Sequence, residues 1–331
     1  VFARQNLASS YVSYDTQTIG TNLLLGVALT EEIALQPRYS IYQQEISIPD
    51  QYNNCSPTTW PSVTGNINPN WDTVSNCYSD GEASLAVRKE LANGPVTVSL
   101  VGYSLTYNTL DNNRLPTSGL WAELKQDFAG VGGDVNFVRS TFDARAYYDV
   151  GWDLVAMFRG QAGHITSWGG EDLRMLDHFF MGPNLVRGFA PYGIGPRDVS
   201  NTSNTYDALG GSIYWGVTAE LQYPLPFAPK DFGMKVAVFA DAGSVWDYKG
   251  ITSYQGSSPF TQTIVPRDVN KIRSSVGAGL IWDSPFGPLR FDYAYAITKD
   301  DGIDVTNINT GVTTRVGDKT QEFRFSGGTK F

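Results

Sequence analysis

The sequence predicts an all-β fold: a transmembrane antiparallel β-barrel, with about twelve strands in this chain of 331 residues. Three observations support this prediction. Apolar and polar residues alternate along most of the chain, aromatic residues reach 13% while charged residues stay at 17%, and the final segment 320–331 alternates strictly. Phe323, Phe325, Gly327 and Phe331 share one parity of that segment, so one face of the strand is aromatic and the other charged. Aromatic terminal strands are typical of membrane barrels.

Composition and charge exclude several other classes of protein. No stretch approaches the roughly 18 apolar residues that a membrane helix needs. The mean hydropathy of -0.22 is typical of a soluble protein, but barrel strands spend every second residue on a polar lumen, so this average underestimates them. The net charge of -9 argues against nucleic acid as a partner. The chain begins at Val1 without an initiator Met or a signal peptide, and we expect an N-terminal part of the protein to lie outside it.

Alternation of apolar and polar residues recurs along the whole chain. Apart from the short segment 1–6, the alternating segments are about ten or more residues long, which is the length that a tilted strand needs to cross a membrane. The predicted strands span 1–6, 16–29, 33–48, 95–110, 118–129, 135–150, 152–165, 211–224, 233–247, 272–283, 289–297 and 320–331. The connections alternate in length, which places short turns on the inner side of the membrane and long loops on the outer side. Short connections lie near 30–32, 111–117, 151, 224–232 and 284–287, and long ones at 49–94, 166–210, 248–270 and 299–319, with a short exception to the alternation at 130–134.

One segment inside the first long loop departs from the strand pattern. Residues 82–92 are rich in helix formers. Ser79 and Glu82 have the spacing of a capping box, and Gly94 can end a helix. We therefore predict a short surface helix, with a strand as the alternative.

The reactive side chains indicate a structural disulfide and no catalytic centre. Cys55 and Cys77 lie in one polar stretch rich in Pro and Asn, and in an oxidising compartment we expect them to pair; two unrelated thiols are the alternative. His164 and His178 lack ligand spacing, which argues against a metal site. No Gly-x-Ser-x-Gly elbow and no phosphate loop occur. We predict that the chain is not an enzyme and needs no cofactor.

The long loop 166–210 carries a motif that resembles the signature of a known family. The motif is Val186-Arg187-Gly188-Phe189, and four other segments accompany it: Gly-Ile-Gly-Pro-Arg-Asp at 193–198, Phe-Ala-Asp-Ala-Gly-Ser-Val-Trp-Asp at 239–247, Ser-Pro-Phe-Gly-Pro-Leu at 284–289, and Phe331. Together these segments resemble the BamA/TamA/Sam superfamily of outer-membrane assembly barrels, and they keep that family's order. The resemblance covers essentially the whole chain; it is nearest to the BamA branch and, in detail, to alphaproteobacterial members.

The resemblance implies a sixteen-stranded barrel in which the motif loop joins the eleventh and twelfth strands. Counted back from the chain end, residues 1–331 resemble strands five to sixteen as one barrel domain, with the first four strands and the periplasmic POTRA domains absent. The implied location is the outer membrane of a Gram-negative bacterium. The implied function is folding and insertion of other outer-membrane proteins without ATP. The implied partners are unfolded clients, accessory lipoproteins, and outer-membrane lipid with lipopolysaccharide.

Parity supplies acidic partners for the motif arginine. If Arg187 folds back into the lumen, its guanidinium needs a carboxylate. The apolar faces of 213–223 and 234–242 leave Glu220 and Asp241 pointing inward. We predict that Arg187 pairs with Asp241, with Glu220 nearby; both also match the family's positions. An exposed loop arginine is the alternative.

The last strand is a candidate lateral gate. Gly327 and Gly328 weaken its end, and an edge strand exposes unpaired N–H and C=O groups to an incoming strand. We predict that this edge, with its aromatic residues Phe323, Phe325 and Phe331, templates client strands. In the family the gate is the seam between the first and last strands. The alternatives are a translocation pore of the TamA or two-partner secretion type, a passive porin and, more distantly, a soluble β-sandwich enzyme.

Overall fold

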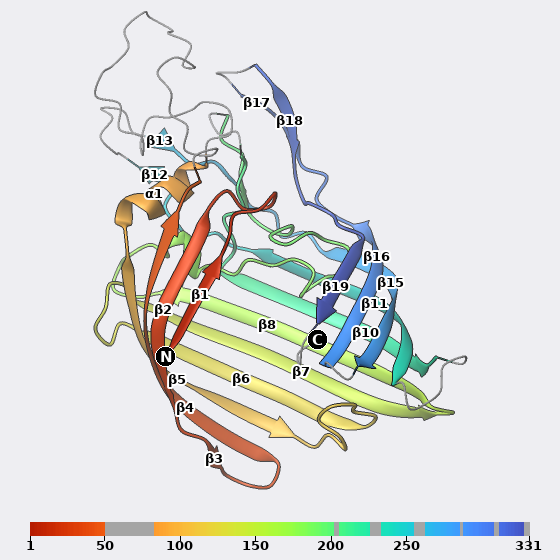
Figure 1. Cartoon of the computed structure of the whole chain (residues 1–331). Coiled ribbons are helices and arrows are strands. Elements are labelled where there is room, and N and C mark those ends of the chain that lie inside the picture. Colours follow the sequence, from red (N-terminus) through yellow and green to blue (C-terminus); the bar gives the residue numbers. More distant parts are fainter. Residues whose placement is uncertain are drawn as a thin grey trace, which may run out of the picture.

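The computed structural model describes residues 1–49, 83–201, 205–225, 233–254, 262–284, 287–307 and 311–327. It is built on one large antiparallel sheet whose main strands are neighbours in chain order (Figure 1). The prediction of an all-β fold with about twelve strands is confirmed. The strands in order are β1 (Phe2–Asn6), β2 (Asp15–Leu24), β4 (Ile33–Ser47), β5 (Val96–Asn108), β6 (Gly119–Ala129), β7 (Phe137–Gly151), β8 (Leu154–Ser167), β10 (Ile213–Pro224), β11 (Met234–Trp246), β15 (Arg273–Ser284), β16 (Gly287–Thr298) and β19 (Phe323–Gly327).

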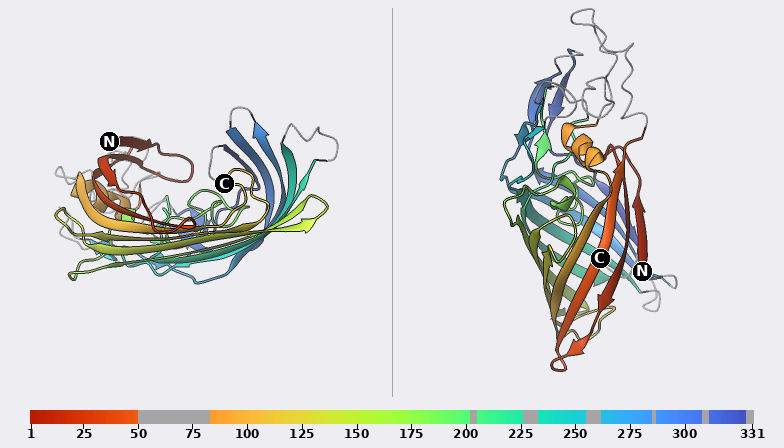
Figure 2. Two further views of the ribbon diagram at one scale, coloured as in Figure 1. Left: turned by 90° about the horizontal axis from the view of Figure 1, so that it is seen from below. Right: turned by 90° about the vertical axis from the view of Figure 1, so that its left-hand side faces the viewer.

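The sheet curves into a trough, and its two edge strands face each other across the open side (Figure 2). Within the described residues β1 and β19 are the two edges and do not pair with one another. Each of them has five residues in the sheet, shorter than the other main strands. Each edge therefore presents a row of backbone groups that the rest of this sheet leaves unpaired.

The pleat separates an apolar outer face from a polar inner face. Phe158, Val238 and Tyr295 point outward and are 57–62% exposed, whereas the inward Asp241 and Arg273 are at most 3% exposed. Loops cross the inside of the trough (Figure 2), and Arg187 from one of them binds Asp241. The described part of the chain contains no helix long and apolar enough to cross a membrane.

The predicted strand 16–29 is wrong in its extent, because β2 ends at Leu24 and a separate β3 (Val27–Ala28) follows. The ladder to β4 is interrupted opposite Pro37, which has no N–H to donate. Leu25 still donates its N–H to the Pro37 carbonyl at 3.0 Å, but no bond returns from the proline.

The predicted helix is present as α1 (Leu85–Asn93), so the strand alternative is wrong. Its expected surface position is also wrong, because Ala86, Val87, Arg88 and Glu90 are at most 5% exposed. Gly94, with φ of 67°, ends it as expected. Ser84 precedes the helix and its side chain makes no capping bond. Its backbone N–H instead donates to Asp207 Oδ2 at 2.8 Å, so a carboxylate from a distant loop occupies the N-terminus of the helix.

The long outer connections contain short elements that alternation over long windows does not detect. Residues 303–316 form a hairpin between β17 (Ile303–Thr306) and β18 (Thr313–Val316). The other short elements are η2 (Met175–Asp177), β9 (Arg197–Asp198), β12 (Ser253–Tyr254), β13 (Gln262–Thr263) and β14 (Pro266–Arg267). Some residues of the sequence predictions lie outside the described part of the chain, namely Cys55, Cys77, Ser79, Glu82, Gly328 and Phe331.

Candidate functional site in the lumen

The motif loop turns back into the trough through a tight backbone arrangement. The Gly182 carbonyl accepts the N–H groups of Leu185 and Val186 at 3.0 and 3.1 Å. Gly188 has φ of 88°, and a Cβ there would lie 3.3 Å from the Ala294 carbonyl oxygen. The left-handed backbone favours glycine at this position, and a side chain there would also be tight against β16.

Apolar side chains anchor the loop against the inner wall. Val186 and Phe189 are 0% and 1% exposed and pack in one cluster with Tyr214 of β10. A Cβ at Gly216 of the same strand would clash with the side chain of Leu185, so the glycine leaves room for the loop. Burial of each large apolar side chain contributes about 1.5–3 kcal/mol.

Arg187 enters a carboxylate-lined site between these anchors. Its Nε and Nη2 donate to Oδ2 and Oδ1 of Asp241, both at 2.7 Å, and its backbone N–H donates to Oδ2 at 3.1 Å. Its Nη1 donates to Oε2 of Glu220 at 2.7 Å. The Phe239 ring lies under the guanidinium, 3.3 Å from Cζ to the ring centroid. The structure thus brings together the three charged residues that the sequence placed in one group, and Arg187 is 7% exposed rather than on the surface.

Two further charged residues of β16 complete the site, and the sequence prediction missed them. Arg290 donates from Nη2 and Nη1 to the two oxygens of Glu220, at 2.7 and 3.1 Å. Its Nε lies 2.9 Å from both oxygens of Asp292. The inward parity of these two residues was visible in the strand 289–297, but nothing in the sequence names their partners. We call the five charged residues the lumenal charge network: Arg187, Glu220, Asp241, Arg290 and Asp292.

Glycines on the neighbouring strand β15 make space for this network. A Cβ at Gly279 would clash with the Asp292 carboxylate, and one at Gly277 would lie 2.5 Å from the Phe239 ring. Both glycines face inward, opposite the apolar residues of the same strand. Their positions follow from the volume of the charged and aromatic groups beside them rather than from a turn.

The last strand presents the predicted aromatic face outward. Phe323 and Phe325 are 55% and 57% exposed, and Phe325 packs on Phe291 of β16 with ring centroids 5.0 Å apart. Gly327 lies opposite Leu289 at the end of the ladder. The strand begins at Phe323 rather than at residue 320, so its predicted extent is wrong at this end.

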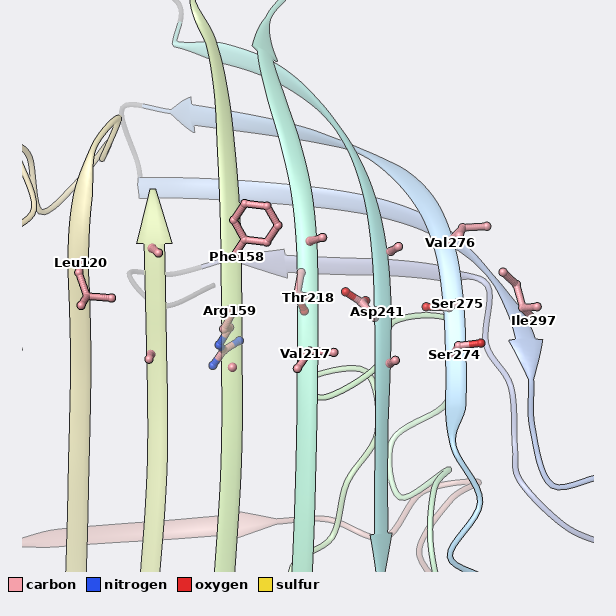
Figure 3. A pocket seen from close by; sticks show the side chains of 16 residues that line it. Leu120, Phe158, Arg159, Val217, Thr218, Asp241, Ser274, Ser275, Val276 and Ile297 are labelled. Carbon is pink, nitrogen blue, oxygen red and sulfur yellow. The ribbon is translucent and has the colours of Figure 1, made fainter. Parts of the chain in front are cut away.

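A hollow of about 680 Å³ lies in the outward face of the wall (Figure 3). Phe158, Val217 and Val276 border it, and each is more than 40% exposed. Asp241 also lines it, although its carboxylate binds Arg187. Most of its lining comes from the apolar face of the sheet, and the polar residues Arg159, Thr218, Ser274 and Ser275 also line it. Small residues also line it, among them Ala144, Gly160, Ala219 and Ala240.

The two histidines have separate environments. His178 Nδ1 lies 2.9 Å from the Arg174 carbonyl, and its Nε2 accepts the Lys249 N–H at 3.1 Å. Burial lowers the pKa of His178 to about 4, so the ring is neutral at pH 7. His164 lies in β8, opposite Ile213. The described ranges contain no group of three His, Cys, Asp or Glu residues placed to hold a metal ion.

Comparison with known proteins agrees with this architecture. The chain is 37% identical over 235 residues to the outer membrane protein assembly factor BamA of Neorickettsia risticii. The matched region is 70% of this chain and 29% of that protein. The chain is 30% identical over 205 residues to the sorting and assembly machinery component 50 homolog B of Xenopus laevis, covering 60% of this chain and 41% of that protein. The chain therefore spans less than half the length of these curated relatives.

A solved structure with the same fold is BamA from Haemophilus ducreyi lacking POTRA domains 1–3. Its TM-score is 0.66 at 21% identity, and the match covers 98% of this chain and 56% of that one. The predicted resemblance to the BamA barrel region, the outer-membrane location and the non-enzymatic class are confirmed by these relatives. The sequence model of the Omp85 superfamily domain matches residues 1–331, and the chain belongs to the Omp85 superfamily.

Proposed function

We propose that this chain is the barrel region of an outer-membrane assembly factor that folds and inserts other β-barrel proteins without ATP. The names of its relatives describe an assembly factor and a component of a sorting and assembly machinery. The observation that carries the proposal is the lumenal charge network, which joins the motif loop to strands β10, β11 and β16.

The network argues against a passive pore. It buries two guanidinium groups and three carboxylates, each at most 7% exposed, inside a lumen that a diffusion channel would keep open. Removing charged groups from water costs several kcal/mol per ion even when they are paired. A loop held at that cost and packed on β16 fits a protein that must fix the position of its wall strands.

The edge of β19 is the proposed site at which client strands are received. Only β16 pairs with it in the described part of the chain, and its other side is free for an extended segment. A client strand can add to this edge by main-chain hydrogen bonds. The burial of the client's apolar face in lipid then supplies the free energy, so no nucleotide is required. The aromatic residues Phe323 and Phe325 keep the outer side of this strand compatible with lipid.

The remaining parts of the proposal follow from the relatives. Residues 1–331 act as one barrel domain of a longer assembly protein, with unfolded outer-membrane proteins as clients. Accessory lipoproteins, outer-membrane lipid and lipopolysaccharide are its other partners. The network residues and the β19 edge are the functional residues, and no metal or cofactor takes part.

Depletion of the protein in its native bacterium tests this function. Several unrelated outer-membrane barrels are followed by heat-modifiable gel mobility, which separates folded from unfolded forms. If all of them fall together, the protein is a general assembly factor. If they persist while a single secreted substrate is lost, the protein is a dedicated translocation pore of the two-partner secretion or TamA type, and the proposed function is wrong.

A further inference from the structure

The last strand leaves the wall before its ladder with β16 is complete. Paired positions run from Leu289 opposite Gly327 to Tyr293 opposite Phe323, and one further bond joins the Ala294 N–H to the Glu322 carbonyl at 2.8 Å. β16 itself continues to Thr298 and remains paired with β15 on its other side. The residues that precede Glu322 therefore do not follow the edge of β16.

Those residues pair with the motif loop instead. Ala190 donates its N–H to the Lys319 carbonyl at 2.9 Å, and Lys319 donates to the Gly193 carbonyl at 3.0 Å. Gln321 donates to the Gly188 carbonyl at 3.0 Å. An isolated antiparallel bridge joins Phe189 to Thr320 between these bonds. The motif loop thus acts as a short strand partner for the segment that enters β19.

Arg324 adds a side-chain connection between the same two segments. Its Nη1 donates to the Pro183 carbonyl at 2.8 Å and its Nη2 to the Asn184 side-chain oxygen at 2.6 Å. Arg324 stands opposite Asp292 in the β16–β19 ladder, so it lies on the inward face beside the lumenal charge network. No bond of the network itself includes Arg324 among the described contacts.

We propose that segment 319–324 and motif loop 182–193 form a latch that sets how much of the last strand lies in the wall, with Arg324 as its positioning residue. While the loop is docked, residues 319–321 are held inside and β19 offers a short edge. When the loop is released, the same residues are free to continue the ladder along Tyr295–Thr298 and to lengthen the edge. Its role in client insertion rests on the proposed function, whereas the coupling itself does not.

The coupling can be measured by amide hydrogen exchange with mass spectrometry on the full-length protein in lipid nanodiscs. One peptide covers the motif loop and another covers 318–323. Arg324→Gln removes two hydrogen bonds, and we expect exchange in both peptides to rise roughly tenfold or more. Arg187→Gln undocks the loop from the wall, and we expect it to accelerate amide exchange in both peptides as well.

Asn184→Asp supplies a test in the opposite direction. It is nearly isosteric and places a carboxylate opposite Arg324, so we expect slower exchange in both peptides. Arg315→Gln is the matched control, since Arg315 lies on the exposed hairpin and pairs with Asp304 at 3.1 Å. It should leave both peptides unchanged.

The results separate the latch from the proposed function. If Arg187→Gln accelerates the loop peptide while 318–323 keeps its native exchange rate, the latch is refuted. The latch is also refuted if Asn184→Asp fails to slow 318–323. If exchange is coupled as expected but all three variants insert a model barrel into liposomes as the wild type does, the coupling stands and its role in client insertion is refuted. If the wild-type protein itself inserts no barrel while exchange is coupled, the coupling stands and the proposed assembly function is contradicted.

Discussion

Replacing Asp241 by asparagine is the sharpest test of the lumenal site. The side chain keeps its shape and loses its charge, and the amide keeps only one of the two oxygens that accept three hydrogen bonds from Arg187. Removing one partner of a buried ion pair costs about 3–5 kcal/mol. Glu220 still contacts Arg187 at 2.7 Å, so the lower end applies. We therefore expect a loss of about 3 kcal/mol, or roughly a hundredfold less of the docked loop.

A double-mutant cycle isolates the interaction from other effects of each change. Asp241→Asn, Arg187→Gln and the double variant are compared by urea unfolding followed through heat-modifiable mobility, and by protease cleavage within the motif loop. We expect a coupling free energy well above 1 kcal/mol, because both side chains are buried and contact each other. The exposed pair Arg315 and Asp304, 58% and 61% exposed, serves as the reference.

The result that would refute this reasoning is a small coupling. Exposed ion pairs contribute about 0–1 kcal/mol. If the Arg187–Asp241 cycle gives a value no larger than the reference pair, the loop is held by its apolar anchors alone. The charge swap Arg187→Glu with Asp241→Arg adds a second check, since it should recover part of what each single change loses.

Three further predictions concern other sites. Gly279→Ala should lower the free energy of unfolding by about 1–3 kcal/mol, because the new Cβ would clash with the Asp292 carboxylate. Gly160→Ala is the control and should leave it unchanged, because a Cβ there meets nothing within 4 Å; urea unfolding compares the two variants. His178, with a pKa lowered to about 4, should stabilise the packed outer loops above pH 6.5 and lose about 2 kcal/mol of that stability by pH 5; loop proteolysis against pH checks this, and His178→Gln should abolish the dependence. Arg114→Gln should change stability by less than about 1 kcal/mol, since its pair with Asp283 leaves the arginine 64% exposed; a larger loss in urea unfolding would mean that this bridge between distant turns supports the barrel.

The sheet could be predicted from the sequence because a barrel wall has a physical period of two. Lipid on one side and a filled lumen on the other act on every strand, so each strand repeats the same signal. The same parity placed Glu220 and Asp241 on the inner face, and the need of a buried guanidinium for a carboxylate linked them to Arg187. Strand parity and the need to pair a buried charge were therefore sufficient to predict the partners of Arg187.

Partners across the lumen could not be predicted in the same way. Arg290 and Asp292 have inward parity, but so do other charged residues, and the choice among them depends on how sharply the sheet curves. The predicted beginning of the last strand was wrong for a related reason. Residues 320 and 321 alternate like the rest of that strand, yet the motif loop offers their backbone a different partner. Alternation shows that a segment is extended and does not show which strand it pairs with.

The lumenal charge network is better explained by placement of the loop than by stability of the barrel. A buried ion cluster often contributes little net stability compared with apolar groups of similar volume, although breaking one pair within it is costly. Apolar contacts of Val186 and Phe189 would hold the loop in the lumen but would tolerate small shifts. The three directed bonds from Arg187 to Asp241 do not, because their donors and acceptors match in one arrangement. The network therefore fixes where the loop meets β16 and the beginning of the last strand, which is the position that the proposed template for incoming strands must keep.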